Sequence, residues 1–192
     1  DMFSHSGQNW GFPTYRWDEI IKDNFSWWRA RLNQASKFYH AYRIDHVLGF
    51  FRIWAVPESE TTGILGHFEP SIPITRASLE DAGFKSETID YLQRPNYSKE
   101  QLAQFLGDAV GDVIGKYFEL FGYSRDRYVL KEKNSSEKAI IALPESSSVK
   151  DALLKIYWNR IFVPHSVGDN LYPYWYWYDQ PVLFTLPQNE QD

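Results

Sequence analysis

The most informative stretch of this sequence is Arg43-Ile44-Asp45-His46-Val47-Leu48-Gly49-Phe50-Phe51-Arg52-Ile53-Trp54. The residues from Ala41 to Asp45 favour β-structure, so we predict a strand that ends near His46. Parallel barrels place catalytic groups at the carboxyl ends of such strands. Arg43 precedes Asp45 by two residues and so shares its side of the strand, where a guanidinium would keep the carboxylate ionised. Asp45 is therefore a candidate nucleophile with His46 as a neighbouring donor; the alternative is an Arg–Asp pair that only tethers the strand end.

The segments next to this stretch predict half of a βαβ unit. From Trp17 to Phe38, apolar residues recur at three- and four-residue steps, which predicts an amphipathic helix. This helix leads directly into the predicted strand, as in alternating α/β folds. Residues 49–57 follow as a predicted loop or short helix.

A second candidate site precedes the helix. Gly7-Gln8-Asn9-Trp10-Gly11 places two amides and an indole on a loop with a glycine at each end. Amides hydrogen-bond to sugar hydroxyls, and an indole can stack on the face of a pyranose ring. The alternative is an ordinary tight turn.

The rest of the chain is predicted to be mainly helical. Residues 58–78 contain the glycines and prolines of irregular structure. We expect short helices over 79–92 broken at Gly83, a helix from a capping box at Ser98 to about Phe121, a strand over 128–130 and a helix over 149–162. The polar stretches 134–138 and 145–150 are expected to be exposed, and the aromatic cluster Tyr172–Tyr178 to need a partner surface.

The composition limits the classes of partner. Lys and Arg number 20 against 25 Asp and Glu in 192 residues, and the net charge of −5 argues against nucleic acid. The mean hydropathy is −0.49, and no apolar run approaches the roughly 18 residues of a membrane span. Aromatic residues make up 18%, which in an acidic chain favours sugars over nucleobases, although a ring-rich core explains them equally well.

Several kinds of chemistry are absent from the sequence. It has no cysteine, hence no disulfide, thiolate metal site or Cys nucleophile, which fits a reducing compartment. The histidines are scattered, and the spacing of His40 and His46 fits no usual metal site. No glycine-rich phosphate loop occurs. We therefore expect no metal site.

Three segments follow one another in a fixed order: Asp1-x-Phe3-Ser4-x-x-Gly7-Gln8-Asn9-Trp10-Gly11-Phe12-Pro13-Thr14-Tyr15, then Trp27-Trp28-Arg29-Ala30-Arg31-Leu32, then Arg43-Ile44-Asp45-His46-x-x-Gly49-Phe50-Phe51-Arg52-Ile53-Trp54. Together they resemble the 4-α-glucanotransferases, also called amylomaltases or disproportionating enzymes, of glycoside hydrolase family 77. The match covers about the first third of the chain. The Phe-Phe-Arg-Ile-Trp ending and the long segment after it are most like the large disproportionating-enzyme subgroup.

The resemblance implies a (β/α)8 barrel and a retaining, double-displacement mechanism that needs no cofactor. It makes Asp45 the nucleophile, with Arg43 and His46 as residues that orient it and contact the sugar. The substrate-contacting loop of the family is matched by Asp1, Gln8 and Trp10. The implied substrates are α-1,4-glucans and malto-oligosaccharides, and the implied location is cytoplasmic, with no nucleic-acid or membrane partner.

The general acid/base of the family does not have a clear match. In the family it is the Glu of a Glu-Asp-Leu-Gly motif that ends a buried strand. Glu80-Asp81-Ala82-Gly83 is similar, but it lies in a polar, helix-like stretch without a preceding strand, so we interpret it as a look-alike. We expect the true Glu, and a third carboxylate in a His-Asp pair, beyond Asp192.

The expected architecture is α/β: a partial (β/α)8 barrel segment carrying a mainly α-helical insertion. Residues 1–57 would belong to the catalytic barrel, 58–170 to the insertion and 171–192 to an aromatic-rich return to the barrel. A complete barrel takes about 250 residues, so we expect the isolated chain to be inactive and to self-associate through uncovered apolar faces. The alternatives are a non-catalytic glucan-binding module, using Trp10, Trp54 and the aromatic cluster, and a protein-interaction module.

Overall fold

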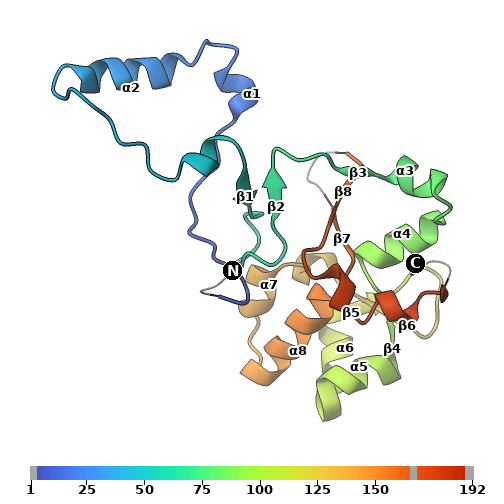
Figure 1. The fold of residues 1–192 in the computed structure, drawn as a ribbon. Helices are drawn as coiled ribbons and strands as arrows, with labels where there is room; N and C mark the ends of the chain where they lie inside the picture. The colour runs from blue at the N-terminus through green and yellow to red at the C-terminus, as the bar shows by residue number, and fades with distance from the viewer. Residues whose placement is uncertain (1–3, 165–167, 189–192) are drawn as a thin grey trace.

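The computed structural model describes residues 4–164 and 168–188, and these residues form two parts (Figure 1). The arm, residues 10–52, projects from the rest of the molecule as a long loop with two helices. Residues 4–9 lead into the arm, and the body, residues 53–164 and 168–188, contains every strand of the described residues and most of the helices. Helix and sheet are both present, as the α/β expectation requires. Over the described ranges, no helix has the length and apolar character needed to cross a membrane.

The strands pair into three small antiparallel sheets. Their orders are β1-β2, β3-β8-β7 and β4-β6-β5. No parallel pair occurs in residues 4–164 and 168–188, so a barrel is not seen in this part of the chain. The bounds are β1 Ile53–Ala55, β2 His67–Glu69, β3 Ile74–Thr75, β4 Tyr97–Ser98, β5 Phe118–Leu120, β6 Arg127–Leu130, β7 Phe162–Pro164 and β8 Asn170–Pro173.

The arm contains two helices where the sequence predicts one. They are α1, Trp17–Ile20, and α2, Ser26–Ser36. The break lies at Asn24 and Phe25, which have left-handed φ values of +57° and +55°. Across this break, the carboxylate of Asp23 accepts hydrogen bonds from the hydroxyl and the N–H of Ser26, at 2.6 and 3.1 Å, and these bonds lower the pKa of Asp23. No residue of the arm is buried.

The strand predicted over Ala41–Asp45 is wrong. The segment is a loop without strand pairing, and it is exposed along its whole length. β-Structure requires a neighbouring strand to satisfy its backbone N–H and C=O groups. No other described segment pairs with these residues, so their preference for β-structure is not realised. A 3₁₀ turn over Val47–Phe50 follows, and β1 then occupies part of the predicted loop.

The segment expected to be irregular, 58–78, contains two strands. β2 pairs with β1 in a hairpin, with Trp54 opposite Phe68, and β3 pairs with β8. The next two helices, α3 (Arg76–Asp81) and α4 (Ser86–Gln93), agree with the prediction for 79–92. They are separated at Gly83, whose φ of +101° suits glycine.

The capping box predicted at Ser98 is confirmed. The Ser98 Oγ accepts from the Gln101 N–H at 3.3 Å, and the Gln101 Oε1 accepts from the Ser98 N–H at 2.8 Å. It opens α5 (Lys99–Leu106), which ends at Gly107 with φ +54°; a 3₁₀ turn over Gly107–Ala109 leads into α6 (Val110–Tyr117). The predicted helix to Phe121 is too long, because residues 118–120 pair with β6 instead. The strand predicted at 128–130 is confirmed as part of β6.

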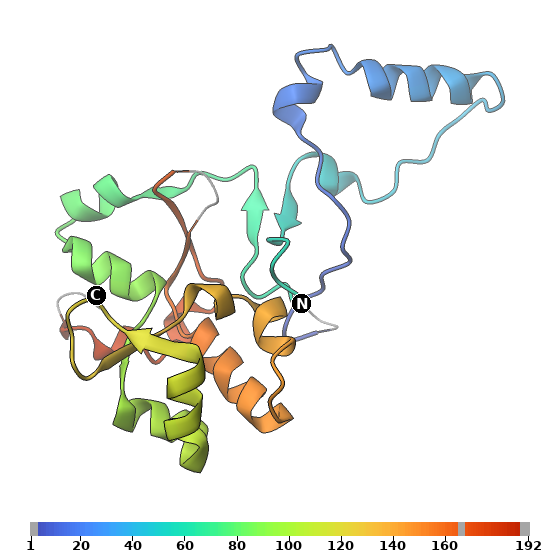
Figure 2. The same cartoon turned by 180° about the vertical axis from the view of Figure 1, so that it is seen from behind.

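Two helices complete the larger core of the body. They are α7, Glu137–Ile141, and α8, Ser147–Trp158; a 3₁₀ turn over Glu132–Asn134 precedes them. Figure 2 shows α5, α6 and α8, in yellow-green to orange, gathered on one side of the body. The larger core includes Leu102, Val113, Phe118, Leu130, Ile140, Leu153 and Ile156, and the smaller core, around α3, α4, β7 and β8, includes Leu79, Ile89, Leu92, Phe162, Leu171 and Val182.

Two polar stretches were predicted to be exposed, and the structure contradicts one of these predictions and confirms the other only in part. Residues 134–138 were expected to be exposed, but Asn134 and Glu137 are buried. Polar side chains can be buried when they are hydrogen-bonded, and both of these are. In the stretch 145–150, residues 146–148 are exposed as expected, while Glu145 is partly buried beneath Tyr117.

The aromatic cluster 172–178 is divided between core and surface. Tyr172 and Tyr174 are buried, whereas Trp175, Trp177 and Tyr178 are 55%, 42% and 51% exposed. Trp175 packs edge-on against Trp54, with ring centroids 5.5 Å apart. The body itself is therefore the partner surface of this cluster. Short 3₁₀ turns over Trp177–Asp179 and Leu183–Thr185 follow.

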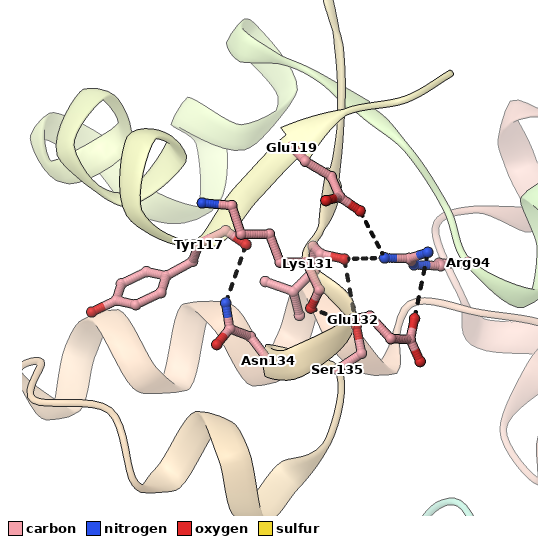
Figure 3. A network of polar contacts seen from close by, with 8 residues as sticks. Arg94, Tyr117, Glu119, Lys131, Glu132, Asn134 and Ser135 are labelled. Carbon is pink, nitrogen blue, oxygen red and sulfur yellow. Dashed lines mark hydrogen bonds and ion pairs between the residues drawn. The ribbon is translucent and has the colours of Figure 1, made fainter.

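Arg94 joins the two cores. It follows α4, and its Nη2 donates to the Leu130 carbonyl of β6 at 2.6 Å and to Glu119 at 3.4 Å, while its Nη1 lies 3.5 Å from Glu132 (Figure 3). In the same network the Asn134 amide donates to the Tyr117 carbonyl at 3.4 Å. These contacts fasten the end of α4 to the central strand of the β4-β6-β5 sheet.

Candidate active site

Arg43 and Asp45 lie on the exposed loop of the arm. The Arg43 Nη2 is 3.8 Å from the Asp45 Oδ1, and each side chain is 90% exposed. The guanidinium and the carboxylate are therefore close together, as expected. The strand that was predicted to place them on the same side is absent from this segment. A fully solvated pair adds little to stability, and here there is no strand end for it to tether. The pair therefore has no evident structural role in the described residues.

His46 follows in a strained backbone conformation. Its φ is +50°, in the left-handed region that residues other than glycine rarely adopt. The Gly49 N–H donates to the His46 carbonyl at 2.9 Å, and a Cβ at position 49 would lie 2.8 Å from the His46 Cδ2. Glycine at 49 therefore leaves room for the imidazole and allows the tight turn directly after Asp45.

Gln8 and Trp10 are joined by their side chains. The Trp10 Nε1 donates to the Gln8 Oε1 at 2.7 Å, and Trp10 is 74% exposed. Between them, the Asn9 Oδ1 accepts from the Gly11 N–H at 2.9 Å. This side chain therefore replaces a backbone acceptor and shapes the turn. The loop thus presents an indole with an open face beside an amide.

The base of this loop rests on residues 60–63 of the body. The Gly63 N–H donates to the Ser6 carbonyl at 2.9 Å, and the Asn9 Nδ2 donates to the Glu60 carbonyl at 3.0 Å. Gly7 and Gly63 are packed backbone to backbone, since a Cβ on Gly7 would lie 3.1 Å from the Gly63 Cα. Gly7 also has φ +69°, so no other residue fits well.

The structure brings the sequence-predicted site residues together only in pairs. Gln8 contacts Trp10, and Arg43 contacts Asp45. Among the described residues, no hydrogen bond or ion pair connects one pair with the other. Asp1 lies outside the described residues. Glu80 is exposed on α3, the helical setting that sequence analysis assigned to the look-alike motif.

Sequence analysis missed two buried carboxylates beneath the Gln8–Trp10 loop. Glu137, at the start of α7, is completely buried and accepts hydrogen bonds from Thr61, Thr62 and Trp158. Burial raises the pKa of Glu137, but the hydrogen bonds from Thr62 and Thr61 outweigh burial and hold its pKa below the ordinary value. The sequence contains only one local signal, a Ser136 N-cap followed by an acidic residue, and that pattern also fits an exposed helix end.

The second carboxylate, Glu60, is 2% exposed. Its Oε1 accepts from the Tyr157 hydroxyl at 2.9 Å and from the Ser59 hydroxyl at 2.8 Å, and its Oε2 accepts from the Glu137 N–H at 3.3 Å. Burial raises the pKa of Tyr157, which keeps its hydroxyl protonated as a donor. The two carboxylates therefore act as acceptors inside a hydrogen-bonded network.

Metal chemistry has no candidate centre in the described ranges. There, no group of three or more His, Asp or Glu side chains could hold a metal ion. His67, one of the scattered histidines, stacks on Tyr172 with ring centroids 4.0 Å apart. The candidate site therefore consists of the Gln8–Trp10 loop and the Arg43–His46 segment.

Comparisons with known proteins place these two segments within one matched region. A family model described as 4-alpha-glucanotransferase matches residues 1–148. The 4-alpha-glucanotransferase DPE2 of Oryza sativa subsp. japonica is 45% identical over 155 residues, which cover 81% of this chain and 16% of that protein. The 4-alpha-glucanotransferase of Thermus thermophilus is 44% identical over 68 residues, covering 35% of this chain and 14% of that protein.

A third relative is the chloroplastic/amyloplastic 4-alpha-glucanotransferase of Solanum tuberosum, 44% identical over 85 residues, 43% of this chain and 15% of that protein. The matched part of the chain thus spans only 14–16% of the length of these relatives. No solved structure matches.

Proposed function

Since this chain belongs to the 4-alpha-glucanotransferase family, glycoside hydrolase family 77, we propose that it is the part of such an enzyme that carries the nucleophile, Asp45. The observation that carries the proposal is the Arg43–Asp45 pair, at 3.8 Å, inside the matched region. The glucan transferase class is supported by the family and by the names of the relatives. The roles of individual residues are our proposal.

In the proposed reaction, an α-1,4-glucan donor binds with its anomeric carbon beside Asp45. A carboxylate oxygen of Asp45 attacks that carbon, the glycosidic C–O bond breaks, and a general acid protonates the departing oxygen. The 4-hydroxyl of an acceptor glucan then attacks the glycosyl ester, its proton passes to the same group acting as base, and Asp45 leaves as carboxylate. Two inversions retain the anomeric configuration, and no cofactor is needed.

The neighbouring residues would prepare this attack. The Arg43 guanidinium would orient the carboxylate of Asp45 for attack, and His46 would donate to a sugar hydroxyl next to the cleaved bond. On the substrate-contacting loop, Trp10 would stack on a pyranose ring and Gln8 would bond its hydroxyls; by the family resemblance, Asp1 would also contact the substrate. The substrates would be malto-oligosaccharides or glycogen-like α-1,4-glucans.

The second carboxylate of the reaction is proposed to lie outside these residues. In retaining enzymes the two carboxyl groups are about 5–5.5 Å apart, and the described chain has no Glu-Asp-Leu-Gly motif. We assign residues 1–57 to the catalytic (β/α)8 barrel, 58–170 to an insertion, and 171–192 to the return. The rest of the barrel would cover the apolar side chains of the arm and give Ala41–Asp45 its strand partners. An isolated chain would self-associate through that face.

This enzyme is proposed to be cytoplasmic, with glucans rather than nucleic acid or membranes as its partners. A second function, glucan binding without catalysis, is favoured by one observation. Trp10, Trp175 and Trp177 keep large parts of their rings exposed. Aromatic faces bind sugars whether or not a reaction follows. The experiment below separates the two functions.

The test is maltotriose disproportionation by two proteins. The whole protein that contains these residues should release glucose together with longer maltodextrins, with the α configuration retained. The 192-residue chain should produce neither, because it lacks the acid/base group, which contributes about 10²–10⁴-fold. Products formed by the chain in proportion to its concentration, and absent from an Asp45→Asn control, would contradict the fragment proposal. Glucan binding by the whole protein without any transfer would favour the binding module.

A further inference from the structure

The loop that carries Gln8 and Trp10 is supported by a buried group of the body that the proposed chemistry does not use. The support is the segment Glu60–Gly63, which receives the loop through the Asn9 side chain and the Ser6 carbonyl. The same segment is held from its other side by Glu137, some 75 residues further along the chain. A single run of contacts therefore leads from the start of α7 to the loop.

We propose that Glu137 is a positioning residue for the Gln8–Trp10 loop, acting through residues 60–63. The inference rests on the proposed function, in which this loop contacts the glucan. Glu137 lies in the part of the chain that we assign to the insertion. The insertion would thus set the geometry of a substrate loop that belongs to the barrel.

The hydrogen bonds to Glu137 explain why a carboxylate is required there. The Oε2 accepts from the N–H groups of Thr61 and Thr62, each at 2.7 Å, and from the Thr61 hydroxyl at 2.8 Å. The Oε1 accepts from the Thr62 hydroxyl at 2.6 Å and from the Trp158 Nε1 at 2.8 Å. Every contact is a donor facing an acceptor, and an ionised carboxylate provides only acceptors. An amide at this position would direct its NH₂ group at one set of these donors.

The charge of Glu137 makes this arrangement rigid. Within the described residues no Lys or Arg forms an ion pair with Glu137, so the hydrogen bonds alone stabilise a fully buried charge. Buried charges without such bonds are strongly unfavourable. Thr61 and Thr62 therefore cannot move away from Glu137 without leaving the charge unsatisfied. This restriction passes to Glu60 and Gly63, the residues that the loop contacts.

The contacts above the segment are close enough to transmit a shift. Gly7 and Gly63 approach so closely that a methyl group on either would contact the other's backbone at 3.1–3.2 Å. Glu60 is fixed as well, because its carboxylate bonds Tyr157 and the Glu137 N–H while its carbonyl accepts from Asn9. A displacement of residues 60–63 would therefore displace the turn at Asn9, and with it Gln8 and Trp10.

The first experiment measures hydrogen exchange in the whole protein containing these residues. Glu137→Gln should increase exchange about three- to tenfold in a peptide covering residues 5–11, the change expected from losing about one hydrogen bond. The matched control is Glu145→Gln. Glu145 is a partly covered carboxylate that likewise accepts from side chains, Tyr117 and Lys116, and none of its hydrogen bonds to described residues involves residues 60–63. Glu145→Gln should leave the exchange of residues 5–11 unchanged.

The second experiment uses a variant that leaves the core intact. Asn9→Ala removes two bonds made by an exposed side chain, the one to the Glu60 carbonyl and the one from the Gly11 N–H within the turn, so the body should fold normally. In maltotriose disproportionation, Asn9→Ala and Glu137→Gln should each raise KM about three- to tenfold, with kcat changed less than twofold. Because both act on the same loop, the rise in KM of the double variant should be smaller than the product of the two single rises. Glu137→Asp, which keeps the charge, should recover part of the exchange protection.

The results separate a positioning role from a purely structural one. The inference is overturned if Glu137→Gln lowers stability but leaves the exchange of residues 5–11 and KM at wild-type values. It is also overturned if the KM effects of Asn9→Ala and Glu137→Gln multiply independently. If the wild-type protein shows no transfer and no maltotriose binding, the proposed function fails. The exchange experiment then still decides whether Glu137 orders the loop.

Discussion

Two helices of nearly equal length, α2 in the arm and α8 in the body, show how differently the two parts are stabilised. α2 has 11 residues and α8 has 12, and apolar spacing predicts both. α2 buries none of its residues, whereas α8 buries Ala152, Leu153, Ile156 and Tyr157. Amphipathic spacing therefore predicts that a helix forms, but the energy of burial depends on whether a second surface covers its apolar side.

The difference extends to the polar residues. In the arm, the Arg43–Asp45 pair is solvated and contributes little to folding, while in the body Glu60 and Glu137 are buried and fully hydrogen-bonded. Substitutions in the arm should therefore act mainly on chemistry, and substitutions of buried residues in the body should lower stability, including Glu137→Gln, which is also proposed to raise KM. The following predictions test that division in order of expected effect.

The largest effect is expected from Asp45→Asn in the whole protein. The amide is a poor nucleophile of similar shape, so maltotriose disproportionation should fall by about 10³- to 10⁴-fold while glucan binding and stability stay near wild type. Glu80→Gln, on the exposed face of α3, is the matched control and should keep transfer within a few-fold of wild type. Near-normal transfer by Asp45→Asn would remove Asp45 from its role, and collapse of Glu80→Gln with intact folding would identify Glu80 as the acid.

A pair of leucines tests the contrast in packing. Leu153→Ala in α8 removes a completely buried side chain and should lower the free energy of unfolding of this chain by about 2–5 kcal/mol. Leu32→Ala in α2 removes a side chain that is 47% exposed, so the change should stay within about 0.5 kcal/mol. Urea denaturation followed by circular dichroism measures both. Equal losses would show that the arm is packed in solution, for example against a second copy.

Glu137→Gln tests the buried charge through its pH dependence. The pKa of Glu137 is lowered in the folded state, so its stabilising effect is present above the ordinary glutamate pKa and is lost as pH falls through the lowered value. The variant should be less stable than wild type by about 1–3 kcal/mol at pH 7, and this difference should shrink below about pH 4. Urea unfolding of wild type and variant at pH 7 and below about pH 4 measures this difference in stability. A difference that grows on acidification would have the wrong sign for a carboxylate held ionised.

The smallest effect concerns two glycines of the body. Gly111 lies inside α6, and a Cβ there would meet nothing within 4 Å, so Gly111→Ala should stabilise the chain by about 0.4–1 kcal/mol. Gly107→Ala is the control: it also has open space, but its φ of +54° disfavours alanine, and it should destabilise. Thermal unfolding measures both changes. A destabilising Gly111→Ala would mean that α6 makes a close contact with a surface outside the described residues.

Local sequence determined the features that depend on neighbours along the chain. The capping box at Ser98, the break at Gly83 and the Arg43–Asp45 proximity involve residues a few positions apart, so their types suffice to predict them. The family resemblance rests likewise on ordered local motifs, and the family match confirms it. The whole constellation of site residues, however, stays a prediction.

Tertiary structure decided the features that depend on distant partners. Ala41–Asp45 has β-forming residues but no neighbouring strand among residues 4–164 and 168–188, so it is a loop, whereas residues 118–120 were predicted to be helical and pair with β6 instead. Glu137 is polar and begins a short helix, yet it is buried because Thr61 and Thr62, some 75 residues away, supply its donors. Burial and strand pairing each involve two segments of the chain. The spacing of residues within one segment does not indicate which other segment will cover it or pair with it.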